Sequence, residues 1–258
     1  MPLTKFHEYH GKNIWLKEEG MVARRSQSFA HALTFSSQPL RNREIFLLEI
    51  EENERGWSGH LRIGLTQLDP SSKFTLPQYA LPDLANMGRT WTMAVTKTKT
   101  GIAVPEDDDT IAVDIDLPPP ARLLSPDGEY ITTSQGRLRK NVLQSTRKGK
   151  QDELLPTDVG SRIGVLFSEN GNNRADMHFI INGEDGGCYA RNIPYKNAPI
   201  YAVVDVYGTT KQVRIVQLNI VANLQDLCKD TILRHTIKKN VEFLPLPLPM
   251  KAFLRDEC

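Results

Sequence analysis

The strongest constraint on the fold is a series of short apolar segments between residues 12 and 218, each ended by Gly, Asn, Asp or Pro. Residues 61–66 alternate in polarity, which is the pattern of a half-buried strand. Residues 177–181 run into Asn182-Gly183, a pair that tolerates positive φ and therefore predicts a tight hairpin. The other strand-like segments are 14–16, 21–23, 45–50, 91–95, 163–167, 201–206 and 213–218.

No long amphipathic helix interrupts this series. Many short strands separated by turn residues predict a mainly β fold, an antiparallel sandwich or barrel. Alternating βαβ units, and with them a parallel nucleotide-binding sheet, are not indicated.

The charge balance and the cysteines exclude several classes of protein. Lys and Arg number 32 against 31 Asp and Glu, so no basic excess suits nucleic acid. No apolar run approaches the about 18 residues of a membrane span, and the first residues do not resemble a secretory signal. Cys188, Cys228 and Cys258 are odd in number and widely spaced, which favours neither disulfides nor a zinc site. We expect a cytosolic protein without a cofactor, metal, nucleic-acid or membrane partner.

Residues 101–157 differ from their surroundings. They hold the acidic run 106–109 and three prolines at 118–120, followed by a basic stretch. Strand-like pieces remain at 111–113 and 130–132. We interpret this region as a long, partly disordered insertion into the sandwich.

The C-terminal segment, residues 222–258, has a different pattern. Residues 223–239 predict a helix, and one apolar stripe runs along it. That stripe is formed by Leu224, Leu227, Cys228 and Ile232. Alternating prolines over 244–249 then predict an extended ribbon, and Pro249 suits the start of a second short helix. So small a segment must pack on the sandwich or on a partner, and periodicity leaves both open.

This segment resembles a SOCS box, on two motifs in the right order. The Elongin-binding motif is matched by Leu224, Cys228 and Ile232, with Leu227 on the same face. The cullin-binding motif is matched over 241–254 by Val241, Leu244, Pro245, Leu246, Pro247, Met250, Phe253 and Leu254. The resemblance implies binding to Elongin B and Elongin C, and to Cullin-5 with its ring-finger protein.

The larger part, residues 5–218, resembles a Neuralized homology repeat. The matching segments are 6–14, 23–25, 28–29, 57–64, 179–183 and 201–208. The resemblance implies an antiparallel β-sandwich of the SPRY or concanavalin-like type that binds other proteins through loops at one end. The insertion at 101–157 departs from the pattern of the family.

Candidate contacts with a target protein are Arg24, Arg25, Trp57 and Tyr207, because Arg, Trp and Tyr are enriched at binding hot spots. Each also has a structural interpretation. Trp57 can seat the entry of a strand, and Tyr207 can cap the core.

No catalytic constellation is indicated. His7 and His10 are three residues apart, whereas the metalloprotease motif needs a spacing of four. His178 and Cys188 flank the predicted hairpin, but we expect a solvent-facing His and a buried Cys, and Asp205 has no evident partner. We therefore expect a non-catalytic substrate-recognition subunit of a ubiquitin ligase. The alternatives are a protein-binding module whose tail packs on its own domain, and a lectin-like sandwich.

Overall fold

The structure is a computed structural model that describes residues 3–98, 123–125, 128–134, 136–145, 154–170, 173–218, 228, 232, 236 and 238–255. The chain divides into two compact units. The first is Met1–Ser134 with Leu138–Leu218, and the second is Gln135–Arg137 with Asn219–Cys258. The strand predicted at 111–113 lies outside the described residues, as does most of the helix predicted at 223–239.

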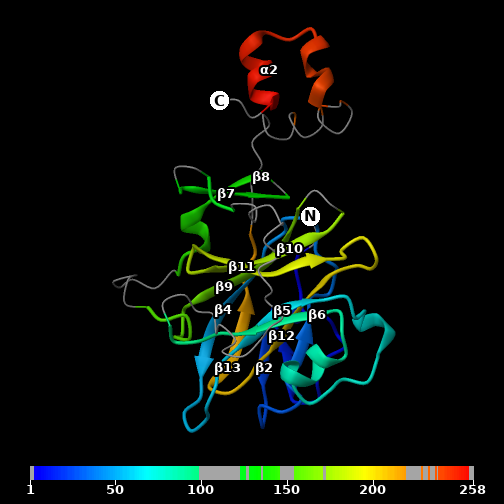
Figure 1. The fold of residues 1–258 in the computed structure, drawn as a ribbon. Coiled ribbons are helices and arrows are strands. Elements are labelled where there is room, and N and C mark those ends of the chain that lie inside the picture. Colours follow the sequence, from blue (N-terminus) through cyan, green and yellow to red (C-terminus); the bar gives the residue numbers. More distant parts are fainter. Residues whose placement is uncertain are drawn as a thin grey trace. The chain divides into compact units, whose positions relative to one another are not determined.

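Two antiparallel sheets form the first unit (Figure 1). The larger is ordered β1 (Ile14–Lys17), β2 (Val22–Arg25), β13 (Thr210–Ile215), β4 (Phe46–Asn53), β9 (Arg162–Glu169), β10 (Ala175–Ile181) and β11 (Glu184–Ile193). The smaller is ordered β3 (Leu33–Phe35), β12 (Tyr201–Asp205), β5 (Arg62–Thr66) and β6 (Thr90–Ala94). Each neighbouring pair in both sheets is antiparallel. The predicted antiparallel sandwich is confirmed.

The remaining elements are short. A two-stranded sheet joins β7 (Tyr130–Thr133) to β8 (Gly136–Arg139). Single helical turns are η1 (Glu18–Gly20), η2 (Pro70–Ser72), η3 (Ala80–Leu84) and η4 (Lys140–Leu143), and the second unit has η6 (Lys238–Phe243) and α2 (Leu248–Arg255). Among the described residues no helix is long and apolar enough to cross a membrane.

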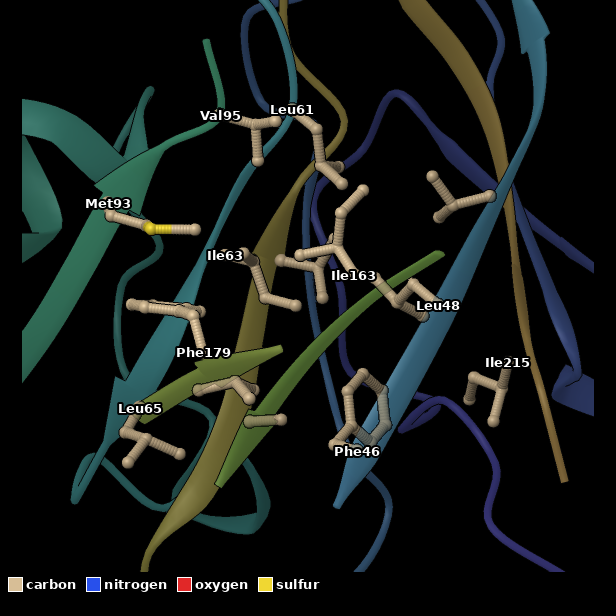
Figure 2. Packing of buried hydrophobic residues seen from close by; sticks show 14 of the residues in the cluster. Phe46, Leu48, Leu61, Ile63, Leu65, Met93, Val95, Ile163, Phe179 and Ile215 are labelled. Atoms are coloured by element: carbon tan, nitrogen blue, oxygen red, sulfur yellow. The ribbon is translucent and has the colours of Figure 1, made fainter. Parts of the chain in front are cut away.

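The core lies between the two larger sheets. Alternate residues of β4, Phe46 and Leu48, face alternate residues of β5, Ile63 and Leu65, and all four are fully buried (Figure 2). An edge-to-face contact with Phe6 holds the ring of Phe46, with 6.0 Å between the ring centroids. The period-two pattern in the sequence places these side chains on one face of each sheet, so burying that face stabilises the sandwich.

The Asn182-Gly183 turn has the predicted conformation. Both residues have positive φ, 50° and 85°, and Ile181 pairs with Glu184 across the turn. Each predicted strand between residues 12 and 98 and between 160 and 218 overlaps an observed one. β3 has no counterpart among the predictions, because its three residues, Leu-Thr-Phe, are too few to establish a period-two pattern.

The described part of the 101–157 region is folded. The strand predicted at 130–132 is β7, and η4 follows β8. The side chain of Arg43 donates a hydrogen bond of 2.9 Å to the carbonyl of Thr132, and Arg162 donates one of 2.9 Å to Val142. These bonds attach the described part of the insertion to the sandwich.

Replacing Phe46 by Ala is expected to lower the free energy of unfolding by about 3–5 kcal/mol, because it leaves a cavity between the sheets. Trp15→Ala is the matched control, since the Trp15 side chain is 61 % exposed and its loss is expected to change stability by about 0.5 kcal/mol or less. Urea unfolding followed by circular dichroism measures both. Equal losses for the two variants would contradict this account of the core.

Candidate functional site

Four aromatic side chains gather at one end of the sandwich. Phe29, Trp57, Tyr79 and Tyr207, here called the aromatic cluster, come from four separate connections between strands or helical turns. Phe29 is central, with its ring centroid 5.0 Å from Trp57, 4.7 Å from Tyr207 and 6.0 Å from Tyr79. Figure 1 shows the β2–β3 and β4–β5 connections, which carry Phe29 and Trp57, at the same lower end of the sandwich.

Tyr207 has two close neighbours outside the aromatic cluster. The guanidinium carbon of Arg62 lies 3.5 Å from the centroid of its ring, a close cation–π contact. Gly59, with φ +77°, also lies close to the ring, and an added Cβ there would be 2.7 Å from the Cε1 atom of Tyr207. Glycine is therefore required at this position both by its backbone and by the ring.

Arg25 is a buried side chain that binds the loops of the cluster. The side chain is fully buried, and burial lowers the pKa of its guanidinium. It donates hydrogen bonds of 2.8 Å to the carbonyls of Gln27 and Gly208 and one of 3.2 Å to the carboxylate of Glu54. Because these acceptors belong to three different connections, one cation ties the loops together.

Trp57 is the most exposed member of the cluster. Its indole N–H donates a 3.1 Å hydrogen bond to Glu54, and the side chain is 40 % exposed. Lys211 binds the same carboxylate at 3.0 and 3.1 Å. The ring is thus held in one orientation while part of it remains available to a partner.

Three of the four predicted target contacts therefore lie together, and Arg24 does not. Arg24 pairs in register with Gln212 of β13 and binds the carboxylate of Glu52 through both terminal nitrogens of its guanidinium. Its neighbour Arg25 turns to the cluster, since successive side chains of a strand point to opposite faces. Phe29 and Tyr79 belong to the cluster but are absent from the sequence prediction. The sequence feature that could have identified these two residues is an aromatic side chain within a polar, turn-rich segment.

Asp205 lies beneath the cluster and has a partner, contrary to the expectation from sequence. It pairs with Arg62 across β12 and β5, with 3.5 Å between Nη1 and Oδ2. Its Oδ2 also accepts a 2.9 Å hydrogen bond from the backbone N–H of Ala80. The residue is fully buried, and burial raises the pKa of Asp205 to about 6 in spite of these favourable contacts.

His178 and Cys188 do face each other across the β10–β11 ladder. The expectation that His178 faces solvent is wrong, because its side chain is 2 % exposed. Burial lowers the pKa of His178 and raises the pKa of Cys188 to about 12, so both groups are neutral near pH 7. A nucleophilic pair needs the thiolate, which this site disfavours.

His7 and His10 are engaged locally. Nδ1 of His7 accepts a 2.8 Å hydrogen bond from the N–H of Tyr9, and Nδ1 of His10 lies 3.0 Å from the carbonyl of Gly11. Within the part of the chain that the structure describes, no group of three or more His, Cys, Asp or Glu side chains is arranged to hold a metal ion.

In the second unit, only part of the predicted Elongin-binding face is described. Cys228 and Ile232 are both helical, and the Cys228 side chain is a free, exposed thiol. Leu224 and Leu227 lie outside the described residues.

The predicted cullin-binding segment is described completely. Val241 and Leu254 are buried, and Leu244, Leu246 and Phe253 are half-buried. Pro245, Pro247 and Met250 are exposed. The ribbon is shorter than predicted, because α2 already begins at Leu248 and Pro249 stands in its first turn, where the absence of an N–H is tolerated.

Comparison with known protein families gives two matches. The model of the Neuralized family matches residues 6–217, and the model of the SOCS box matches residues 221–255. Neuralized-like protein 2 of Homo sapiens is 42 % identical over 269 residues, covering 99 % of this chain and 93 % of that protein. The E3 ubiquitin-protein ligase NEURL3 of Homo sapiens is 38 % identical over 90 residues, 34 % of each protein.

Among solved structures, the Drosophila melanogaster neuralized-NHR1 domain is similar in fold. The TM-score is 0.55 at 24 % identity, over 84 % of this chain and 99 % of that domain.

Replacing Arg25 by Met is expected to lower the free energy of unfolding by about 2–4 kcal/mol, because buried carbonyls lose their donor. Arg24→Met removes an ion pair from the solvated face and is expected to lower it by about 1 kcal/mol or less. Urea unfolding compares the two variants. A larger loss for Arg24→Met would contradict the assignment of Arg25 as the buried anchor.

The raised pKa of Asp205 predicts a specific pH dependence of the free energy of unfolding. Its pKa in the folded state is raised, so its favourable contribution is complete below the unfolded pKa and is lost as pH rises through about 6. Between pH 5 and pH 7 the wild type is expected to lose about 1 kcal/mol relative to Asp205→Asn, which does not titrate. Urea unfolding of both proteins at the two pH values measures the difference. A constant difference, or one of opposite sign, would refute the raised pKa.

Proposed function

Because this chain belongs to the Neuralized family and carries a SOCS box, we propose that it is the substrate-recognition subunit of a ubiquitin ligase built on Elongin B, Elongin C and Cullin-5. The observation that carries the proposal is the succession of the two matched families in one chain, 6–217 and then 221–255. A SOCS box implies assembly with Elongin and a cullin in general. The proposal assigns target binding to residues 5–218 and docking to residues 222–258.

Docking to Elongin is assigned to the stripe of Leu224, Leu227, Cys228 and Ile232. Side chains at this spacing form one face of a helix, which suits insertion into an apolar groove. The exposed thiol of Cys228 supports this, since a small side chain at the centre of such a face lets the two surfaces approach closely. The segment 241–254 is assigned to Cullin-5.

Target binding is assigned to the aromatic cluster. Trp57 offers a partly exposed ring held in place by Glu54, and Tyr207 is held by Arg62, so little conformational entropy is lost when a partner binds. Aromatic side chains on a rigid support are typical of binding hot spots. Arg25 is assigned a supporting role here, since its guanidinium is already committed to protein acceptors.

The proposed mechanism requires no catalytic residue in this chain. Holding a target beside the charged conjugating enzyme raises the effective concentration of its lysines at the reactive thioester. The neutral states of His178 and Cys188 support this view of the sandwich as a binding domain. Such a complex acts in the cytoplasm, where free thiols stay reduced.

A protein-binding scaffold without ligase function is the alternative. The aromatic cluster serves that role equally well, because its contacts lie within the first unit. The two functions differ in whether the tail binds Elongin.

The test is co-expression with Elongin B and Elongin C, size-exclusion chromatography and then addition of Cullin-5. We expect stoichiometric co-elution of all four proteins. Leu224→Ala with Cys228→Ala is expected to weaken Elongin binding at least about tenfold, because two side chains of the buried face are truncated. Gln225→Ala with Lys229→Ala has the same spacing one position along the helix and serves as the control.

Undiminished Elongin binding by the Leu224/Cys228 variant would reject the assigned face. A wild-type chain that elutes alone would reject the ligase role and leave the scaffold function.

A further inference from the structure

Residues 243–250, here called the apolar run, form an unusual surface in the second unit. The sequence Phe-Leu-Pro-Leu-Pro-Leu-Pro-Met has no charged or polar side chain. Six of the eight residues are exposed, Leu244 and Leu246 are half-buried, and none is buried. Burial normally removes such side chains from water, so a contiguous exposed run of this kind indicates an interaction surface.

The exposure is concentrated in two residues outside the cullin-binding motif. Phe243 is 84 % exposed and Leu248 is 76 % exposed, the two highest values among the large apolar side chains that the structure describes. Met250 follows within the motif at 51 %. The motif alone therefore does not identify the side chains that are most available to a partner.

The two ends of the motif have the opposite character. Val241 in η6 is fully buried and Leu254 in α2 is 3 % exposed, and these two elements pack against each other. The amine of Lys251 donates a 2.6 Å hydrogen bond to the carbonyl of Glu242, which adds a polar tie between η6 and α2. Val241 and Leu254 therefore stabilise the fold of the segment itself.

We propose, on the basis of the function proposed above, that Phe243 and Leu248 are specificity-determining contacts with the cullin, whereas Val241 and Leu254 are internal packing residues. The run lies within the matched SOCS box, 221–255, and is part of the segment 241–254 that is assigned above to Cullin-5. Its prolines hold the backbone in place before binding, which limits the entropy lost.

The absence of charge defines the chemistry of the partner site. With no ion pair available from residues 243–250, affinity depends on apolar burial, and the cullin must offer an uncharged apolar groove. Binding through this run is therefore insensitive to salt, in contrast to binding steered by surface charge.

The test uses the full chain bound to Elongin B and Elongin C, titrated with the N-terminal part of Cullin-5 by isothermal titration calorimetry. Phe243→Ala and Leu248→Ala are each expected to weaken cullin binding about tenfold, or about 1.4 kcal/mol. Trp15→Ala, which truncates an exposed aromatic side chain of β1, is the control and is expected to leave the affinity within about twofold.

Hydrogen exchange separates contact residues from packing residues. Phe243→Ala and Leu248→Ala are expected to leave amide exchange over residues 238–255 unchanged in the complex with Elongin. Val241→Ala is expected to accelerate it, because truncating a buried side chain opens the η6–α2 packing.

The outcomes distinguish the two proposals. If the wild-type complex does not bind Cullin-5, the proposed function and this inference both fail. If it binds and the Phe243 and Leu248 variants stay within about twofold of it, only the inference fails. If those variants instead lose Elongin, the run contacts Elongin and the assignment to the cullin is wrong.

Discussion

Apolar side chains from two antiparallel sheets share one interior, and the placement of each loop at the ends of the sandwich follows from that packing. Packing of the sheets does not by itself fix the aromatic cluster. Its members come from four connections, and the sheets alone would not fix the positions of these connections relative to one another. Buried polar groups supply the extra constraint. Arg25 binds acceptors in three connections, and Arg62, which pairs with Asp205, lies against the ring of Tyr207. Asp205 is in turn bound by the N–H of Ala80 as well as by Arg62. The geometry of the aromatic cluster thus depends on a few buried ionic groups.

Much of the sandwich could be predicted because its strands and turns follow from patterns among neighbouring residues of the sequence. Alternation in 61–66 and the Asn182-Gly183 turn each depend on neighbouring residues, and the structure confirms both. β3 escapes prediction because three residues are too few to establish a period-two pattern. The sequence also predicts a solvent-facing His178, but every residue of β10 is buried, so both faces of this strand are covered. The cause is tertiary, and sequence periodicity cannot reveal it.

The candidate site could be predicted only in part, because its contacts join residues that are far apart in the sequence. Trp57 and Tyr207 were recognisable by residue type, yet nothing local links them to Phe29 or Tyr79. The partner of Asp205 follows from the pairing of β12 with β5, a contact between residues more than a hundred positions apart. In the second unit, the motif identifies the segment 241–254 but does not separate its buried ends from its exposed middle.

The exposure of the tryptophans has an optical consequence. Trp15 and Trp57 are 61 % and 40 % exposed, and Trp91 is half-buried, so none of the three indoles lies in the dry interior. Trp91 nevertheless packs against the core and Trp57 against Phe29, so separation of the sheets will change the surroundings of both indoles. Trp57, beside a carboxylate and a guanidinium at the loop end, will respond to a ligand that displaces its water. The fluorescence of Trp57 will thus report events at the aromatic cluster.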